Sequence, residues 1–501
     1  MIHPFLLAAF PVLYVYASNV EYAVPLTDVL PWLIGLMAGA GLAMLVAWLA
    51  LRGDGLRAGL VATVLVLLFF SYGQIFLRIE GWAIGGVELG RHLYLLPMWG
   101  ALAVLGVIAA VRAGRRTALL TKGLNIAAAV LVLSNLATIG WYELRSGGDV
   151  SPTLAQEVRN LGVSASPDTA GKPDIYYIIL DRYGGEPALR GQFGFDNRPF
   201  LDSLEDRGFY VASDSTANYP KTAHSLASSL NLEFLNGLDG GGTPDNWGPI
   251  YELLQNHEVG SFLKSRGYRY VHIGSRWQPT ATNPQADLNV RLKGDLSEFS
   301  SAVLESTILP AFGGAIDRLD HRHREYLRPL FQFEKLAETR ELGGPTFVFA
   351  HILLPHEPYL FDRNGGFISR KAQESRTLEQ NYTEQLMFTN QKVLEAVDRL
   401  LEGPEESRPV IIIQADEGPF SEDWQTRPDQ IKQKFSILNA FHLPGVEKPG
   451  LYPSITPVNT FRLLFNLYFD AGLELLPDDN HIFPDLKHLY SFIRVTDRVQ
   501  G

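Results

Sequence analysis

The pattern of apolar and polar positions divides the chain into two parts. The first 142 residues hold five long apolar runs, at 4–17, 29–51, 60–77, 92–111 and 123–142. A helix of about 20 apolar residues spans a bilayer, and the last four runs meet or approach that length. The first run is shorter and contains Pro4 and Pro11. The pattern predicts an N-terminal transmembrane bundle of about five helices, or of four if the first run lies in the interface.

Basic residues between the apolar runs predict the orientation of the bundle. They follow the second and the fourth runs, at Arg52, Arg57, Arg112, Arg115, Arg116 and Lys122. Because positively charged links stay in the cytoplasm, everything after residue 142 is expected on the extracytoplasmic side. A signal peptide is an alternative for the first run, but no positive charge precedes it and no cleavage pattern follows.

The rest of the chain alternates two other patterns. Residues 143–172 are rich in Ser, Gly, Asp and Pro, with one periodic piece at 154–161, and this composition predicts a linker. From residue 173, short β-branched runs alternate with amphipathic segments, which is typical of an α/β domain with a mostly parallel sheet and helices on both faces. The expected strands are 174–181, 209–212, 268–274, 345–351, 409–415 and 435–441. The expected helices are 198–207, 222 onwards, 250–266, 297–340, 381–401 and 457 onwards.

Composition narrows the possible partners and the possible chemistry. The net charge of the 501 residues is −11, which disfavours a nucleic-acid partner because phosphate backbones select basic surfaces. The chain has no cysteine, so it contains neither disulfides nor thiolate metal sites nor a cysteine nucleophile. Candidate chemistry therefore rests on carboxylates, hydroxyls and histidines.

Two buried strands end in acids. Asp181 follows the run 174–180, and Asp416 with Glu417 follows the run 409–415. Open α/β sheets place ligand chemistry at the carboxyl ends of their strands. Two strands that deliver carboxylates to one edge of a sheet predict a metal or phosphate site there.

A hydroxyl at a helix start is the candidate nucleophile. Pro220 and the Ser/Ala/Leu-rich segment that follows place Thr222 where a helix begins. Free N–H groups and the helix dipole at that position favour an alkoxide and phosphoryl oxygens. The alternative role for Thr222 is that of a plain helix N-cap.

Five segments in order resemble the alkaline phosphatase/sulfatase superfamily, and within it the membrane-anchored headgroup transferases of the lipoteichoic acid synthase and phosphoethanolamine transferase kind. They are Pro173-Asp-Ile-Tyr-Tyr-Ile-Ile-Leu-Asp181, Asn218-Tyr-Pro-Lys-Thr222-Ala-His-Ser, Tyr268-Arg-Tyr-Val-His-Ile-Gly274, His351-Ile-Leu-Leu-Pro-His356-Glu-Pro-Tyr359 and Gln414-Ala-Asp416-Glu417-Gly418. Sulfatases carry a Cys or Ser within a Cys/Ser-x-Pro-x-Arg segment. Here Thr222-Ala-His-Ser stands in its place, which favours a phosphotransferase over a sulfate-ester hydrolase.

The resemblance implies a set of metal ligands. Asp181, Thr222 and Asp416 match ligand positions, and Thr222 matches the nucleophile. Glu417 stands where most relatives have histidine, so the implied site is all oxygen. Such a site suits Mn²⁺, Mg²⁺ or Ca²⁺ better than Zn²⁺. A metal site that has decayed, in a pseudoenzyme, is the alternative.

Histidines and one arginine are the expected substrate-side residues. The resemblance implies that His356, and secondarily His351, contact the transferred group. His272 and Arg276, in and after the strand 268–274, are further candidates.

The expected protein is thus an integral, multi-pass cell-membrane enzyme with domains 1–142, 143–172 and 173–501. It would move a phosphoryl-linked headgroup from a membrane lipid to an envelope glycan or lipid through a phospho-Thr222 intermediate, with one divalent metal ion. A membrane-anchored phosphodiesterase or other sulfatase-like hydrolase, and an inactive envelope-assembly scaffold, remain open, and the sequence leaves the oligomeric state open as well.

Overall fold

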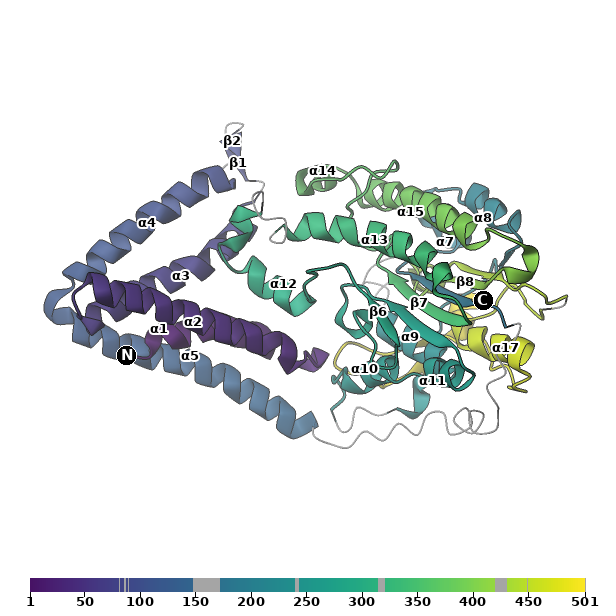
Figure 1. Cartoon of the computed structure of the whole chain (residues 1–501), viewed down its shortest axis with the longest axis horizontal. Helices are drawn as coiled ribbons and strands as arrows, with labels where there is room; N and C mark the ends of the chain where they lie inside the picture. The colour runs from purple at the N-terminus through teal and green to yellow at the C-terminus, as the bar shows by residue number, and fades with distance from the viewer. Residues whose placement is uncertain are drawn as a thin grey trace. The chain divides into compact units, whose positions relative to one another are not determined.

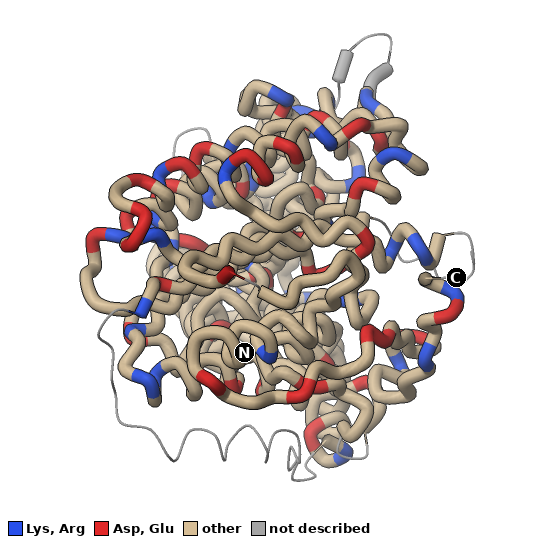
Figure 2. Tube along the Cα trace, turned by 90° about the vertical axis from the view of Figure 1, so that its right-hand side faces the viewer, with Lys and Arg blue, Asp and Glu red and all other residues tan. Residues whose placement is uncertain are grey.

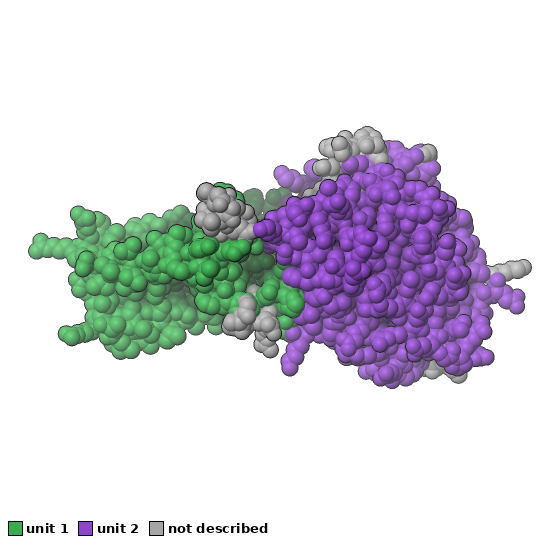
Figure 3. All heavy atoms as spheres, turned by 90° about the horizontal axis from the view of Figure 1, so that it is seen from above, with its two compact units in different colours: residues 1–147, 294–324 green, residues 148–293, 325–501 purple. Residues whose placement is uncertain are grey.

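The computed structural model describes residues 1–80, 82–84, 87–88, 90–146, 172–238, 243–313, 320–419, 430–447 and 449–500 (Figure 1). The chain forms two compact units, coloured separately in Figure 3. Unit 1 comprises residues 1–147 and 294–324, and unit 2 comprises residues 148–293 and 325–501. The predicted linker helix at 154–161 lies outside the described residues.

Unit 1 contains the predicted apolar helices. Its main helices are α1 (His3–Ala17), α2 (Leu26–Ala50), α3 (Gly55–Ile79), α4 (His92–Arg112) and α5 (Thr117–Ser146). Four helices of the described part, α2 to α5, are long and apolar enough to cross a membrane, whereas α1 is shorter. The predicted bundle of apolar helices is therefore confirmed, and α1 corresponds to the shorter first apolar run.

A short helix from the second half of the sequence also belongs to unit 1. This helix, α12 (Glu298–Glu305), packs against α1 and α2. Its Phe299 and Val303 join an apolar cluster with Val12, Tyr16 and Val29. The indole N–H of Trp32 donates to Ser300 Oγ at 3.0 Å. The prediction of one helical stretch over 297–340 was wrong: α12 is followed by a 3₁₀ turn with Pro310 at its second position, and α13 begins only at His321.

Unit 2 is built on a seven-stranded sheet in the order β4-β9-β8-β3-β7-β5-β6. Its strands are β3 (Ile175–Leu180), β4 (Tyr210–Val211), β5 (Arg269–Ile273), β6 (Leu288–Val290), β7 (Thr346–Ile352), β8 (Val410–Ala415) and β9 (Asn439–His442). Within this sheet β9 pairs antiparallel with both β4 and β8, and the other strand pairs are parallel. The predicted mostly parallel α/β fold is confirmed. The strand β6 was not predicted, and β9 starts later than expected because α16 (Ile431–Phe435) precedes it.

Helices cover both faces of the sheet (Figure 1). On one face lie α7 (Glu186–Phe193), α8 (Arg198–Glu205), α13 (His321–Glu338) and α15 (Leu378–Leu400). On the other face lie α9 (Thr222–Asn231), α10 (Gly248–Gln255), α11 (Glu258–Ser265) and α17 (Pro457–Phe469). Charged positions of both signs follow the outer helices in Figure 2.

Successive side chains of β3 point to opposite faces of the sheet, and each set packs against one of the two helical layers. Tyr176, Ile178 and Leu180 are buried in one core cluster with apolar residues of α13 and α15. Tyr177 points the other way, with its ring 4.9 Å from that of Phe461 in α17. All six residues of β3 are buried, as its unbroken apolar run predicts for a central strand.

The helix predicted over 250–266 is in fact two helices. They separate at Asn256 and His257, and His257 is the N-cap of α11, with its Nδ1 accepting from the N–H of Gly260 at 2.9 Å. Its Nε2 lies 3.1 Å from the hydroxyl of Tyr270. A side chain that caps a new helix inside an apolar pattern has no signature in hydrophobic periodicity.

Substituting Gly73 should release α12 from unit 1. A Cβ built at Gly73 of α3 would lie 2.1 Å from the carbonyl oxygen of Glu305, at the end of α12. Gly73→Ala therefore forces the backbone of one element away, at a cost of about 1–3 kcal/mol. We expect faster cleavage near residue 306 in limited proteolysis of the full chain in detergent. Gly100→Ala in α4, with open space around its Cβ, is the matched control. Equal protection of both variants would contradict the packing.

Buried His257 should make unit 2 sensitive to mild acid. Burial lowers the pKa of His257 to about 3, with a smaller contribution from the charge of His272. The unfolded chain then binds more protons than the folded one below pH about 6.5, so stability is present above that pH and falls as pH falls toward 3. The loss approaches roughly 1.4 kcal/mol per pH unit.

His257→Asn keeps a capping acceptor and removes the titrating group. We expect the urea midpoint of this variant to change less between pH 7 and pH 5 than that of the wild type. An unchanged difference between the two pH values would show that His257 does not cause the sensitivity.

Candidate functional site

Strand register brings the two predicted acids to one edge of the sheet. β3 pairs in parallel with both β7 and β8, and Leu180 lies opposite Ile352 and Ala415. Asp181 and Asp416 each follow directly on these positions. The N–H of Arg182 donates to Asp416 Oδ1 at 3.0 Å, which ties the two strand ends together.

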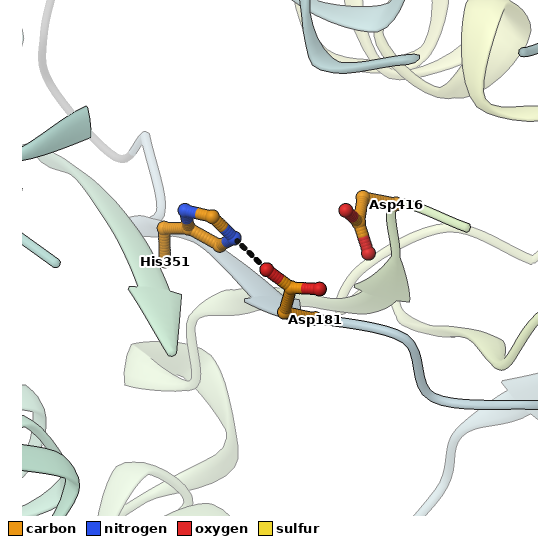
Figure 4. Close-up of side chains that lie close together, drawn as sticks. All are labelled: Asp181, His351 and Asp416. Carbon is orange, nitrogen blue, oxygen red and sulfur yellow. Dashed lines mark ion pairs between the residues drawn. The ribbon is translucent and has the colours of Figure 1, made fainter. Parts of the chain in front are cut away.

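Asp181, His351 and Asp416 form a buried cluster at this edge (Figure 4). Each offers one possible ligand atom, and these atoms all lie within 4.8 Å of one another. His351, in β7, places its Nε2 3.4 Å from Asp181 Oδ2. In the described part of the chain this is the group whose geometry fits a metal ion.

Unsatisfied atoms show that the cluster fits a cation. Asp181 Oδ1, Asp416 Oδ2 and His351 Nε2 are buried and have no hydrogen-bond partner. A buried carboxylate oxygen without a partner costs free energy comparable to a lost hydrogen bond or more. Two such oxygens and a ring nitrogen facing one another are the donor set that a divalent cation satisfies.

The charges of the cluster conflict when no cation is counted. Burial raises the pKa of Asp416 well above its ordinary value, and the charges of Asp181 and Glu417 raise it further. Burial also acts to raise the pKa of Asp181, but the charges of His356, His351 and Arg182 lower it below its ordinary value. One carboxyl is therefore forced toward its neutral form by the other, and a cation removes that conflict.

His351 is oriented by a second hydrogen bond. Its Nδ1 lies 2.8 Å from Thr280 Oγ1, which leaves Nε2 to face Asp181. Metal-binding histidines are commonly held in this way through the other ring nitrogen. The sequence assigned His351 to the substrate side, whereas the structure brings it into the carboxylate group and adds a nitrogen donor.

Thr222 is the first residue of α9, beside Asp416. The N-cap of α9 is Lys221, in an extended conformation, and no side chain caps the helix. The Thr222 hydroxyl instead lies close enough to Asp416 to moderate the rise in the pKa of that carboxyl. Thr222 is thus not the N-cap that the sequence left open. Its hydroxyl lies at a helix N-terminus whose first N–H groups have no partner within the helix.

Glu417 is held by two cations. Its Oε1 accepts from Arg182 Nε at 2.9 Å and from Lys434 Nζ at 2.8 Å, and the Glu417 and Lys434 side chains are almost fully buried. Burial acts to raise the pKa of Glu417, but Lys434, Arg182 and Lys221 lower it. Glu417 lies outside the group whose ligand atoms converge within 4.8 Å. Its Oε2 is buried without a hydrogen-bond partner.

The remaining predicted substrate-side residues, His356, His272 and Arg276, lie in different surroundings. His356 is close enough for its charge to act on the pKa of Asp181, and its Nδ1 is hydrogen bonded to the carbonyl of Glu357. His272 is buried, with Nδ1 3.1 Å from the Tyr270 hydroxyl and Nε2 2.8 Å from the Thr280 carbonyl. Arg276 forms an ion pair with Glu325. The structure thus brings His356 to the carboxylates and engages His272 and Arg276 in contacts with the protein itself.

Three residues of the site were missed. Arg182 follows a predicted ligand directly, so its position was a usable signal. Lys434 lies in a short helix before β9, and Thr280 lies in a 3₁₀ turn after β5. No sequence pattern marks either, because only the tertiary fold brings them to the strand ends.

Comparison with known proteins finds no matching family model and no matching curated protein. Among solved structures, the chain is similar to the C-terminal periplasmic domain of EcEptC from Escherichia coli, at 14% identity and a TM-score of 0.43, over 66% of this chain and 94% of that one. It is similar to the integral membrane protein lipooligosaccharide phosphoethanolamine transferase A from Neisseria meningitidis, at 12% identity and a TM-score of 0.41, over 92% of this chain and 95% of that one. It is also similar to the lipoteichoic acid synthase LtaP from Listeria monocytogenes, at 14% identity and a TM-score of 0.39, over 68% of this chain and 86% of that one.

These matches are of the two kinds that the sequence motifs resemble. Because the identities are low and the TM-scores lie below 0.5, the functional proposal rests on the residues of this chain.

Removing the nitrogen donor should remove bound metal. We expect purified His351→Ala protein in detergent to retain far less divalent metal than wild type in elemental analysis, because two carboxylates alone lack the third ligand. Thr280→Val, which removes only the orienting hydroxyl, should weaken metal affinity about 10-fold or more. His488→Ala, at an exposed position, is the control. Full metal content in His351→Ala would exclude His351 as a ligand.

Proposed function

We propose that this protein is a metal-dependent enzyme that transfers a phosphoryl-linked headgroup through a covalent bond to Thr222. The observation that carries the proposal is the convergence of the Thr222 hydroxyl, at a helix N-terminus, on the buried cluster of Asp181, His351 and Asp416. A nucleophile, a cation site and free backbone N–H groups are what phosphoryl transfer needs.

The transfer follows from the positions of these groups. Thr222 Oγ1 forms a bond to phosphorus, the bond from phosphorus to the lipid oxygen breaks, and that oxygen takes a proton from water. The hydroxide left behind is neutralised by the acceptor's proton, which His356 releases to solvent in the second step. The Thr222 proton passes to the neighbouring Asp416 carboxylate. Asp181, His351 and Asp416 would hold a divalent ion, which when bound would lower the pKa of the hydroxyl and neutralise charge on the phosphoryl oxygens.

The second step returns Thr222 to its starting form. An acceptor hydroxyl attacks phosphorus, the bond to Thr222 breaks, and Thr222 recovers its proton from Asp416. His356 holds its Nδ1 against the Glu357 carbonyl, so Nε2 carries the free lone pair that takes the acceptor's proton.

The apolar helices support a membrane lipid as donor. Four helices are long and apolar enough to cross a bilayer, and the basic links between them favour an extracytoplasmic catalytic domain. The proposed donor is thus a phospholipid headgroup, and the proposed acceptor is a glycan or lipid of the envelope. Phosphoethanolamine and lipoteichoic acid chemistry are named for the similar solved proteins.

The donor set favours an ion that accepts mixed ligands. Two carboxylates and one imidazole suit Mn²⁺ and Zn²⁺ better than Ca²⁺ or Mg²⁺, which prefer oxygen alone. We therefore propose Mn²⁺ or Zn²⁺, a change from the all-oxygen set expected from the sequence.

Thr222→Ala tests the nucleophile. Full-length protein in vesicles that contain phosphatidylethanolamine and phosphatidylglycerol should acquire a headgroup adduct on the Thr222 peptide, seen by mass spectrometry. We expect Thr222→Ala to lose the adduct and to lower turnover of bis(p-nitrophenyl) phosphate by roughly 10³-fold or more.

Ser225→Ala is the matched control. It removes a hydroxyl three residues after Thr222 in the same helix and should retain both signals. An adduct that survives Thr222→Ala would exclude Thr222 as nucleophile. An adduct that is released to water in the presence of envelope acceptors would favour a hydrolase, and absence of both signals in wild type would favour a scaffold.

A further inference from the structure

Arg182 has an unusual backbone conformation at the edge of the metal cluster. Its φ is +59°, in the left-handed region that non-glycine residues rarely adopt. Contacts on both sides hold it there, since its N–H donates to Asp416 Oδ1 and its carbonyl accepts from the Tyr382 hydroxyl at 2.9 Å. Such strain persists where the surrounding contacts over-determine the backbone conformation, and it is commonly found at functional sites.

That direction places the guanidinium beside the cluster. Nε donates to Glu417 Oε1 at 2.9 Å, and Nη1 lies 3.4 Å from Glu357 Oε1. Among the described residues, Nη2 takes no hydrogen bond or ion pair. The side chain is 15% exposed, so it is mostly shielded from solvent. Its charge acts on the pKa values of both Asp181 and His356.

Lys434 leaves the charge of Arg182 in excess. Glu417 accepts from both cations through the same oxygen, and the Lys434 and Glu417 side chains are 2% and 1% exposed. One carboxylate balances one of the two positive charges. Asp181 and Asp416 balance a divalent ion, and the remaining charge of Arg182 faces only the longer, 3.4 Å contact with Glu357, whose side chain is 54% exposed. Solvent weakens that pair, so the Arg182 charge stays partly uncompensated and favours an anionic group.

We propose that Arg182 binds the non-bridging oxygens of the phosphoryl group beside Thr222, and that Glu417 positions Arg182 instead of binding the metal. A guanidinium with a free nitrogen recognises a phosphate through paired hydrogen bonds. Glu417, in the place where relatives have a histidine, accepts from Nε and so holds the guanidinium within reach of the charge of Asp181. This assignment rests on the proposed function, because it takes the phosphoryl group to lie at Thr222.

The first experiment measures binding without turnover. Full-length protein in detergent, loaded with Mn²⁺, is titrated with inorganic phosphate while its Tm is followed. Wild type should show a phosphate-dependent rise in Tm. Arg182→Gln and Arg182→Lys should require roughly 10- to 100-fold more phosphate for the same rise, because a charge-assisted pair of hydrogen bonds is lost. Arg190→Gln, at an exposed arginine that pairs with Glu186 and Asp196, should match the wild type.

The second experiment separates positioning from metal binding. Glu417→Gln should raise KM for bis(p-nitrophenyl) phosphate with a smaller change in kcat, and should keep the full metal content in elemental analysis. Loss of metal in Glu417→Gln would overturn the positioning role and make Glu417 a ligand. Unchanged phosphate affinity in both Arg182 variants would overturn the anion-binding role.

If Thr222→Ala keeps full turnover, the proposed function fails; if it abolishes turnover while Arg182→Gln binds phosphate normally, only the inference on Arg182 fails.

Discussion

The parallel pairing of β8, β3 and β7 is the constraint on which the site depends. Because the three strands run in one direction and in fixed register, the residues that follow them are delivered to one edge. Two carboxylates and an imidazole are held there in the interior, where neither acid finds a full set of partners. The sheet core, apolar on both faces, provides the free energy that holds these polar groups together. A slip of one residue would turn Asp181 into the helical layer and separate the cluster.

Much of this arrangement follows from local sequence. The strands at 174–181 and 409–415 are unbroken apolar runs, each followed or ended by an acid. The sequence therefore predicts both their burial in the sheet and the carboxylates at their carboxyl ends. Thr222 was placed at a helix start by Pro220 and the small residues that follow. The long apolar runs predicted the membrane helices equally well, because nothing else in a chain of this kind needs 20 apolar residues in a row.

What could not be predicted depends on contacts between distant segments. Whether a histidine at a strand end serves the metal or the substrate is a matter of which way its ring turns, and Thr280, 71 residues before His351 in the chain, decides that. The split at His257 arises from a side-chain cap, and the extra edge strand β6 is too short to show alternation. The partner of Glu417 is a lysine whose own helix is five residues long. Departure from a familiar motif at one position is therefore understood only together with the residues that changed around it.

The place of α12 bears on how the protein is made. Phe299 and Val303, which complete the packing of α1 and α2, lie far later in the sequence, so Val12, Tyr16 and Val29 have these partners only after synthesis has passed residue 305. Biogenesis of unit 1 therefore cannot finish before much of unit 2 has emerged. Conversely, a polypeptide that begins at residue 173 would present Phe299 and Val303 to water with nothing to cover them, and a version meant to be soluble would need that segment replaced by polar sequence.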